Sequence, residues 1–162
     1  MALYDEYSDA MYRFMLFKVS DRDLAWDLTQ DCFMKTWHYF ATKEHEVENK
    51  KAFLYTIARN LVIDHWRQKE KRATIDIDLV AHTIEDGNDL YATTVLQDEI
   101  RSLMGLLNKL PEHDKEILVM RYAEELSFDE IAKTTGKSNV AARVHAHRAL
   151  KKLKMIAQKH RK

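Results

Sequence analysis

The segment FLYTIARNLVIDHWRQKEKR, residues 53–72, carries side chains that can bind a polyanion on one side of a predicted helix. At about 100° per residue, its apolar residues fall on one broad arc and its polar residues on a narrow opposite arc. Guanidinium groups bind phosphates through paired hydrogen bonds. A merely solvated side more usually carries Glu and Lys, so the narrow arc is a candidate binding surface. It comprises Thr56, Arg59, Asn60 and Arg67, with Trp66 at its edge and Ile63 inside it.

A second candidate surface lies in the segment SFDEIAKTTGKSNVAARVHAHRALKKLK, residues 127–154. Ser127 and Glu130 have the spacing of a capping box at the start of a short helix. Gly136 can adopt the left-handed turn conformation, and Ser138 can cap a second helix. A helix, a glycine turn and a second helix form the helix-turn-helix motif, whose second helix enters the major groove of DNA.

The second helix of this motif has a packing side and a basic side. Small apolar residues at helical spacing predict a buried seam, formed by Ala142, Ala146, Ala149 and Leu153. This seam is too weakly apolar for a membrane-bound helix. Arginine pairs with guanine through two hydrogen bonds, and lysine neutralises phosphates. We therefore predict duplex contacts from Ser138, Arg143, Val144, His145, His147, Arg148 and Lys151, with Lys152 on the same surface.

The histidines do not predict a metal site. His145 and His147 lie about 200° apart around a helix, so they cannot converge on one ion. His65 lies on an apolar arc and is predicted to be a core residue, and HEVE, residues 45–48, lacks the second histidine of a metalloprotease motif. The sequence has no glycine-rich phosphate loop, nucleophile elbow or marked pair of catalytic carboxylates. We expect no metal, no cofactor, no small-molecule substrate and no enzymatic activity.

The composition predicts an all-α, cytoplasmic protein. The 162 residues are 46% hydrophobic, which is enough to form a core and excludes a disordered chain. Gly occurs 3 times and Pro once, so strands and tight turns are disfavoured. The single cysteine, Cys32, excludes an intramolecular disulfide and suits a reducing compartment. No apolar run approaches the length of a membrane span, and no signal peptide is visible.

The net charge of zero hides two basic blocks. Residues 49–72 hold 7 Lys and Arg against 2 Asp and Glu, and residues 131–162 hold 10 against none. Residues 73–100, between them, hold 7 acidic residues and no basic one. Solvated helix sides explain most charge runs, but ten cations without an anion favour binding to a polyanion.

Periodicity divides the chain into two predicted helical domains, residues 1–72 and 94–162, joined by an acidic linker over residues 73–93. In the second domain, one helix is predicted over residues 94–108 and another begins at Pro111.

In the first domain, helices are predicted over residues 3–18 and 21–40, the latter capped by Asp21, and a loop follows over residues 41–50. The aromatic residues of the second helix share one side, which we predict to be core. Its polar residues share another side, and their spacing leaves open whether this side is solvated or binds a partner. The aromatic stripe is Trp26, Phe33, Trp37 and Phe40, and the polar stripe is Asp27, Asp31, Lys35 and His38.

Four segments follow one another over nearly the whole chain: DLTQDCFMKTW (27–37), AFLYTIARNLVIDHWRQKEKR (52–72), LPEHDKEILVMRYAEELSFDEIAKTTGKS (110–138) and VAARVHAHRALKKL (140–153). They resemble the conserved blocks of regions 2 and 4 in bacterial extracytoplasmic-function (ECF) RNA polymerase sigma factors of the sigma-70 family. The resemblance implies a two-domain factor that binds core RNA polymerase and directs it to promoter DNA. In the family, the first domain melts and recognises the minus-ten element, and the second recognises the minus-thirty-five element as duplex.

The resemblance implies roles for residues of the first domain. Segment 52–72 carries the family's minus-ten surface, and the loop 41–50 corresponds to one that captures a flipped base. Basic grooves with aromatic side chains bind single strands, which agrees with this assignment. The implied minus-ten contacts are Asn60, Asp64 and Arg67. From their charge, Arg59 and Lys50 are predicted to bind phosphates, and Trp66 is predicted either to stack on a base or to pack in the core.

The resemblance also implies protein partners. Asp27, Gln30 and Asp31 match the surface that meets the clamp helices of the largest polymerase subunit, and carboxylates suit a basic partner. The second domain is expected at the flap region of the polymerase. Family members are commonly held inactive by an anti-sigma factor, which makes such a protein a further candidate partner.

The second helix of the helix-turn-helix departs from the family pattern. Where the family usually has Thr-Val-Lys/Arg-Ser-Arg, this chain has Ala141, Ala142, Arg143, Val144 and His145. His145 replaces a permanent cation by a group that titrates near neutral pH, so we expect His145→Arg to tighten DNA binding at about pH 8. Duplex binding is predicted, without a specific minus-thirty-five sequence.

Two other functions remain open from the sequence. VAARVHAHRALKKL also resembles the helix-turn-helix of response-regulator output domains, but residues 1–72 lack the strands, glycine turns and acidic pocket of a receiver domain. The other alternative is a helical adaptor with basic surfaces and no DNA partner. Binding to core polymerase separates the sigma factor from both, and salt-dependent DNA binding separates the regulator from the adaptor.

Overall fold

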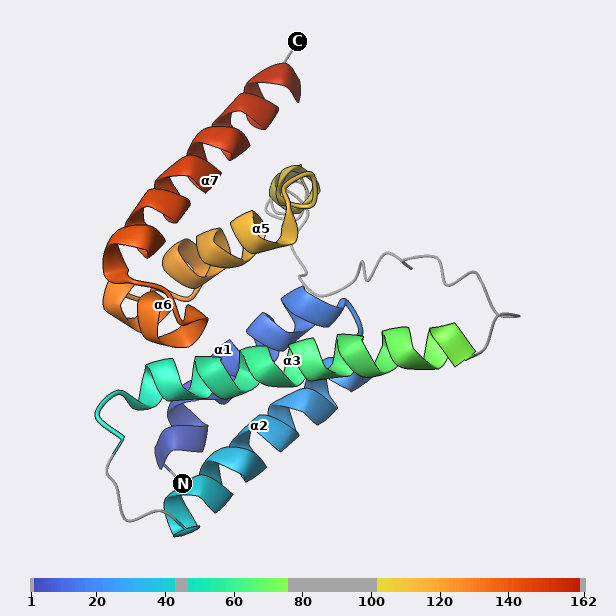
Figure 1. The fold of residues 1–162 in the computed structure, drawn as a ribbon, viewed down its shortest axis with the longest axis vertical. Helices are drawn as coiled ribbons and strands as arrows, with labels where there is room; N and C mark the ends of the chain where they lie inside the picture. Colours follow the sequence, from blue (N-terminus) through green and yellow to red (C-terminus); the bar gives the residue numbers. More distant parts are fainter. Residues whose placement is uncertain (1, 43–46, 76–101, 161–162) are drawn as a thin grey trace. The chain divides into compact units, whose positions relative to one another are not determined.

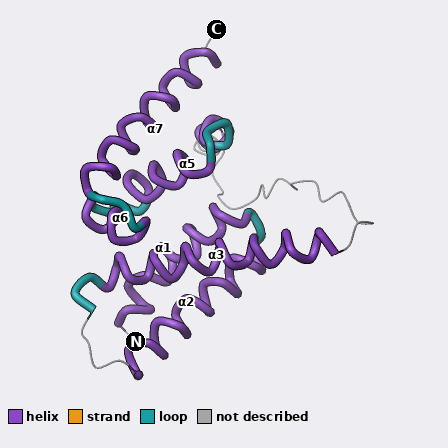
Figure 2. The backbone as a smooth tube through the Cα atoms, viewed as in Figure 1, coloured by secondary structure: helices purple, strands orange, loops and turns teal. Residues whose placement is uncertain are grey.

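The computed structural model describes residues 2–42, 47–75 and 102–160, which form helices joined by short loops (Figures 1 and 2). No strand occurs within these ranges, and the predicted all-α class is confirmed. The chain divides into two compact units, Met1–Asn88 and Asp89–Lys162. The predicted linker lies outside the described residues, apart from its first three positions, which continue a helix.

The described residues of the first unit form three helices, α1 (Ala2–Val19), α2 (Arg22–Thr42) and α3 (Lys50–Ile75), each in contact with the other two. Ser20 makes the sharp turn between α1 and α2 with a positive φ of 54°. The predicted N-cap is confirmed, because Asp21 Oδ1 accepts a hydrogen bond from the Leu24 amide at 3.0 Å. The predicted loop 41–50 is partly described: Asn49 Oδ1 accepts from the Ala52 amide at 2.8 Å and so caps α3.

The core of this unit lies between large side chains of α1 and α3. Phe14 and Tyr55 are fully buried and meet edge to face, with ring centroids 5.2 Å apart. The predicted apolar arc of α3 is buried at Leu54, Ala58, Leu61 and Val62 and half-buried at Ile57. Burying these surfaces stabilises the bundle by roughly 25 cal/mol per Å² of apolar area.

The aromatic stripe of α2 is not core, and that prediction is wrong. Trp26 and Trp37 are 51% and 71% exposed, and Phe33 and Phe40 are only half-buried. Helix α2 instead packs through one leucine and four small residues, and the small residues allow its backbone to approach its neighbours closely. These buried residues are Ala25, Leu28, Thr29, Cys32 and Thr36.

The polar groups on this buried side of α2 are satisfied. The hydroxyls of Thr29 and Thr36 each donate to the carbonyl four residues back, at 2.7 Å, which removes the cost of burying them. Burial raises the pKa of the Cys32 thiol to about 12, against smaller opposite effects of Thr36 and Lys35. The thiol therefore stays protonated and packs as a small apolar group.

The second unit contains a helix over residues 102–107, then α5 (Glu112–Leu118), a π-helical turn η1 (Val119–Ala123), α6 (Phe128–Thr135) and α7 (Asn139–His160). Helix α7 packs on both α5 and α6 (Figure 1). The widened turn is closed by the Glu124 amide, which donates to the Val119 carbonyl at 3.0 Å. The core is made of Ile117, Leu118, Met120, Leu126, Ile131, Ala142, Ala146 and Ala149.

The predicted helix-turn-helix is confirmed in its details. Ser127 Oγ accepts from the Glu130 amide at 3.2 Å, and Glu130 Oε2 accepts from the Ser127 amide at 2.8 Å, so the capping box is complete. Gly136 ends α6 with a φ of +68°, which side chains disfavour. Ser138 Oγ accepts from the Ala141 amide at 3.1 Å and caps α7. The alanine seam is buried, and Leu153 at its end is half-buried.

Candidate nucleic-acid and partner interfaces

The predicted binding surface on α3 keeps its polar residues together. Asn60, Asp64 and Arg67 are exposed at i, i+4 and i+7, so the helix brings their side chains onto one side. Arg59 beside them is half-buried, and Lys50 is exposed at the first residue of α3, more than two turns away. An amide, a carboxylate and a guanidinium in a row can hydrogen-bond both to base edges and to phosphates.

The aromatic end of the α3 surface is partly exposed. Trp66 is 38% exposed, with the His65 ring at a centroid distance of 5.5 Å and the Lys69 ammonium 5.1 Å from its ring centroid. The indole is therefore available for stacking on a base, and the Lys69 ammonium beside it can attract a phosphate. This combination suits single-stranded nucleic acid. His65 is half-buried, so its prediction as a core residue is wrong.

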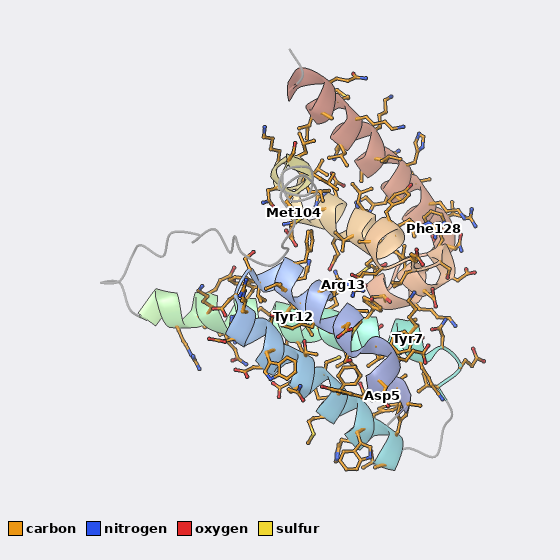
Figure 3. All side chains as sticks on the ribbon, turned by 180° about the vertical axis from the view of Figure 1, so that it is seen from behind. Asp5, Tyr7, Tyr12, Arg13, Met104 and Phe128 are labelled. Atoms are coloured by element: carbon orange, nitrogen blue, oxygen red, sulfur yellow. The ribbon has the colours of Figure 1, made fainter. Side chains whose placement is uncertain are left out.

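The side of α2 that faces away from the core combines acidic and apolar side chains. Asp27 and Asp31 are exposed, and Gln30 is half-buried with its amide 3.4 Å from the Tyr4 hydroxyl. Met34, 60% exposed, lies on the same side of α2, between the two stripes noted in the sequence. Exposed large apolar groups beside charges are typical of a protein interface. The aromatic residue Trp26 contacts Tyr12 of α1, labelled in Figure 3, at a centroid distance of 6.1 Å.

The basic surface of α7 brings most of its predicted members together. Arg143, Val144, His147, Arg148 and Lys151 are exposed along one side of the helix. Ser138, also exposed, uses its hydroxyl oxygen to cap the helix. This side offers hydrogen-bond donors, cations and one exposed apolar residue, the types that contact base edges and phosphates in the major groove.

His145 does not lie on this surface. Its side chain is 17% exposed and its Nε2 lies 2.8 Å from Oδ1 of Asp114, a residue of α5 that is 2% exposed. Lys152 Nζ lies 2.5 Å from the other oxygen of Asp114, so it too is turned toward α5. These two members of the predicted DNA surface instead hold α7 against α5 through a buried carboxylate.

The environment of Asp114 favours its charged form. Burial alone would raise the pKa of Asp114. Hydrogen bonds from Lys152 and His145, together with the charges of Lys152 and His113, outweigh this effect, so the pKa of Asp114 lies below its usual range. The Lys137 ammonium lies 3.4 Å from His145 Nδ1 and can only donate, which leaves the ring proton on Nε2, facing Asp114.

Three possible metal ligands meet in this cluster. Ligand atoms of His113, Asp114 and His145 lie within 4.8 Å of one another. Local spacing does not indicate this convergence, because Asp114 and His145 are 31 positions apart. Two ammonium groups, from Lys137 and Lys152, already occupy free lone pairs of these residues. We therefore assign the cluster to helix pairing, since added positive charge would oppose a cation there.

The chain matches two family models. One, described as Sigma-70 region 2, matches residues 3–72, and the other, described as Sigma-70, region 4, matches residues 100–153. No helix in the described parts has the length and apolar character needed to cross a membrane.

Similar proteins and solved structures are also sigma factors. The ECF RNA polymerase sigma factor SigM of Bacillus subtilis is 30% identical over 95% of this chain and 92% of its own length. The ECF RNA polymerase sigma factor BldN of Streptomyces coelicolor is 29% identical over 93% of this chain, which spans 57% of BldN. The sigma factor RpoE of Bartonella quintana, solved with the anti-sigma factor NepR, has a similar fold, with a TM-score of 0.76 and 24% identity over 97% of this chain and 95% of its own.

Proposed function

The chain belongs to the ECF sigma factors of the sigma-70 family, and we propose which of its surfaces perform each part of that role. An ECF sigma factor binds core RNA polymerase and promoter DNA and so initiates transcription. This chain acts in the cytoplasm with the polymerase and without catalysis of its own. The response-regulator and adaptor alternatives are set aside, because regions 2 and 4 both match.

The two promoter elements are divided between the two domains. Residues 1–72 bind the minus-ten element, residues 94–162 bind the minus-thirty-five element, and residues 73–93 link them. The matched ranges 3–72 and 100–153 support this division. So does the separation of charge, since each domain has its own block of cations.

The α3 surface binds the melted minus-ten strand. Asn60 and Asp64 contact base edges, and Arg67, Arg59 and Lys50 contact phosphates. Support comes from the exposure of Asn60, Asp64 and Arg67 on one side of α3 and from the partly exposed Trp66 at its end. An unstacked base offers its full hydrogen-bonding edge to an amide, which paired DNA does not.

The α7 surface binds the minus-thirty-five duplex. The base edges or nearby phosphates are contacted by Arg143, Val144 and His147. Phosphates are also contacted by Arg148 and Lys151. Ser138 lies at the start of α7, where it caps the helix beside the proposed DNA surface. His145 and Lys152 have a structural role instead, because both are turned to Asp114.

The outer side of α2 binds polymerase. Asp27, Gln30 and Asp31 meet the clamp helices of the largest subunit, with Met34 as an apolar contact, and the second domain meets the flap region. Exposed carboxylates suit a basic partner surface. An anti-sigma factor is a further partner, since sigma factor RpoE was solved with one.

Site-specific crosslinking tests whether the two domains bind different promoter elements. This assignment rests on the presence of two polar helix surfaces in two separate domains. A photo-crosslinking residue is placed at Asn60 in one variant and at Arg148 in another, and each is assembled with core polymerase on a promoter. We expect the first to crosslink to the minus-ten strand and the second to the minus-thirty-five duplex. Crosslinking of both positions to the same element would contradict the proposal.

A further inference from the structure

The guanidinium of Arg143 is held by two contacts where α6 and α7 meet. Its Nε donates to Oδ1 of Asn139 at 2.7 Å, one helical turn earlier. Its Cζ lies 4.9 Å from the ring centroid of Phe128. Phe128 is the first residue of α6 and is labelled in Figure 3. An exposed arginine normally samples many rotamers, so these contacts select a few of them.

The side-chain amide of Asn139 is itself oriented by α6. Its Nδ2 lies 2.5 Å from Oδ1 of Asp129. A carboxylate can only accept, so the amide nitrogen must face Asp129 and the amide oxygen must face Arg143. The orientation of Asn139 therefore follows from the chemistry of its two neighbours.

Phe128 is fixed independently of Arg143. It follows Ser127, the residue of the capping box, and is half-buried. A second guanidinium, of Arg121, also lies 4.9 Å from its ring centroid and is anchored by a hydrogen bond from Nη1 to the Leu126 carbonyl at 3.0 Å. The ring thus offers Arg143 a stable surface for cation–π contact.

These contacts decide which donors Arg143 has left. With Nε bonded to Asn139, its two terminal nitrogens remain, and such a pair matches O6 and N7 of one guanine in the major groove. The carboxylate of Asp129 lies one hydrogen bond beyond Asn139, so a phosphate bound at Arg143 would also approach a negative charge. A neutral base edge therefore suits Arg143 better than a phosphate does, and exposed Val144 next to it suits a thymine methyl.

We infer that Phe128 and Asn139 are positioning residues that preset Arg143 to recognise a guanine of the upstream duplex. This inference rests on the proposed role of α7 and goes beyond it, because neither positioning residue is exposed on the basic surface of α7 or needs to touch DNA. Phe128 limits the plane of the guanidinium, and Asn139 limits its rotation within that plane.

The test is selection from a duplex DNA pool randomised over the upstream element, using the full chain assembled with the core polymerase of its own cell. For the wild type we expect one position at which guanine is preferred about tenfold. Arg143→Lys should lose this preference, because an ammonium keeps the charge but lacks the planar pair of donors. Phe128→Leu and Asn139→Leu should each reduce the preference severalfold at that same position.

Two further measurements separate positioning from a general structural effect. Phe128→Tyr keeps the ring and should retain the guanine preference, while Phe128→Leu does not. The slope of log affinity against log salt should stay unchanged in Phe128→Leu and Asn139→Leu, because no phosphate contact is lost. Thermal unfolding of each variant reports whether the domain remains folded, and Asp129→Ala, a change at an exposed residue, gives an independent way to release Asn139.

The possible failures are distinguishable. If Arg143→Lys loses the preference but Phe128→Leu, Asn139→Leu and Asp129→Ala all keep it, the positioning inference is overturned and the role of α7 stands. If Arg143→Lys keeps every base preference, or if Arg143→Ala weakens all sequences equally with a smaller salt slope, Arg143 is a phosphate contact and the inference is overturned. If no upstream sequence is selected at all, the proposed role of α7 falls with it.

Discussion

His145 of α7 lies against Asp114 of α5, with Nε2 2.8 Å from Oδ1 of a carboxylate that is 2% exposed. Lys152, two turns further along α7, binds the other oxygen of the same carboxylate at 2.5 Å. Besides its buried alanine seam, α7 is therefore tied to α5 through one buried carboxylate, so its orientation depends in part on Asp114. This arrangement gives three side chains a structural role next to the α7 surface that we propose binds DNA.

Replacing Asp114 by Asn should destabilise the second domain. The variant leaves Lys152 without its buried partner, and the expected loss in free energy of unfolding is about 1–3 kcal/mol, moderated because Lys152 can turn into water. Urea denaturation followed by circular dichroism measures the change. Asp9→Asn, at an exposed residue of α1, is the matched control and should leave stability unaltered. Equal stability of Asp114→Asn and the wild type would contradict the structural role.

The same carboxylate should make stability depend on pH. Its pKa is lowered in the folded state, so its contribution is present above the ordinary aspartate pKa of about 4 and is lost as pH falls through the lowered value. The difference in unfolding free energy between wild type and Asp114→Asn should therefore shrink below about pH 4. A difference that stays constant between neutral and acidic pH would show that Asp114 does not act through its charge.

His145→Arg should not tighten DNA binding at about pH 8, in contrast to the expectation from sequence. The His145 side chain is directed at Asp114 and is only 17% exposed. An arginine at this position would therefore disturb the contact between α7 and α5 and would not add a phosphate contact. Affinity for a promoter duplex, measured by fluorescence anisotropy, should be equal or weaker. Arg148→Ala is the comparison and should weaken binding and lower the salt slope by about one. A tighter complex for His145→Arg would mean that position 145 reaches the phosphates.

Neutralising the acidic side of α2 should weaken the complex with core polymerase. The double change Asp27→Asn and Asp31→Asn removes two exposed charges, and exposed ion pairs contribute about 0.2–1 kcal/mol each, so affinity should fall up to about thirtyfold at low salt. The matched control is the double change Asp5→Asn and Asp9→Asn on α1. Binding titrations with core polymerase at two salt concentrations decide the matter, and equal effects of the two double variants would refute a specific contact.

Removing the amide of Asn60 should impair promoter melting without affecting assembly. Asn60→Ala should leave the α3 fold intact because the residue is exposed. It should remove the base-edge contact that we propose for Asn60, which would be worth about 1–3 kcal/mol. Permanganate reactivity of melted thymines should fall about fivefold or more at equal occupancy of core polymerase. Gln158→Ala, an exposed amide near the end of α7, should have no effect. Unchanged melting in Asn60→Ala would remove this residue from the minus-ten surface.

The features that sequence predicted well are those encoded by neighbours in the chain. The capping box of Ser127 and Glu130 and the turn at Gly136 depend on residues within a few positions, so their types and spacing were sufficient. The α2 stripe failed for the opposite reason. An aromatic arc and a small-residue arc are both plausible packing sides, and the choice at Trp26 and Trp37 depends on how closely α1 and α3 approach.

Contacts between residues that are far apart in the chain could not be predicted from the local sequence pattern. Asp114 and His145 are 31 positions apart, and the sequence offers no signal that a histidine on a basic helix side turns toward a carboxylate in α5. The hydrogen bond between Asp129 and Asn139 likewise joins two polar residues that look solvated in sequence. Burial of a charge pair is decided by three-dimensional packing, which periodicity does not report.

Run-off transcription shows whether the α3 and α7 surfaces of this sigma factor recognise different promoter elements. The chain, the core polymerase of its own cell and a pooled library of upstream sequences are combined, with Asn60→Ala and Arg143→Lys assayed in parallel. We expect discrete start sites that need the chain, altered selection of the minus-ten element only in Asn60→Ala, and altered selection of the minus-thirty-five element only in Arg143→Lys. Absence of chain-dependent start sites together with absence of binding to that core polymerase would exclude this role.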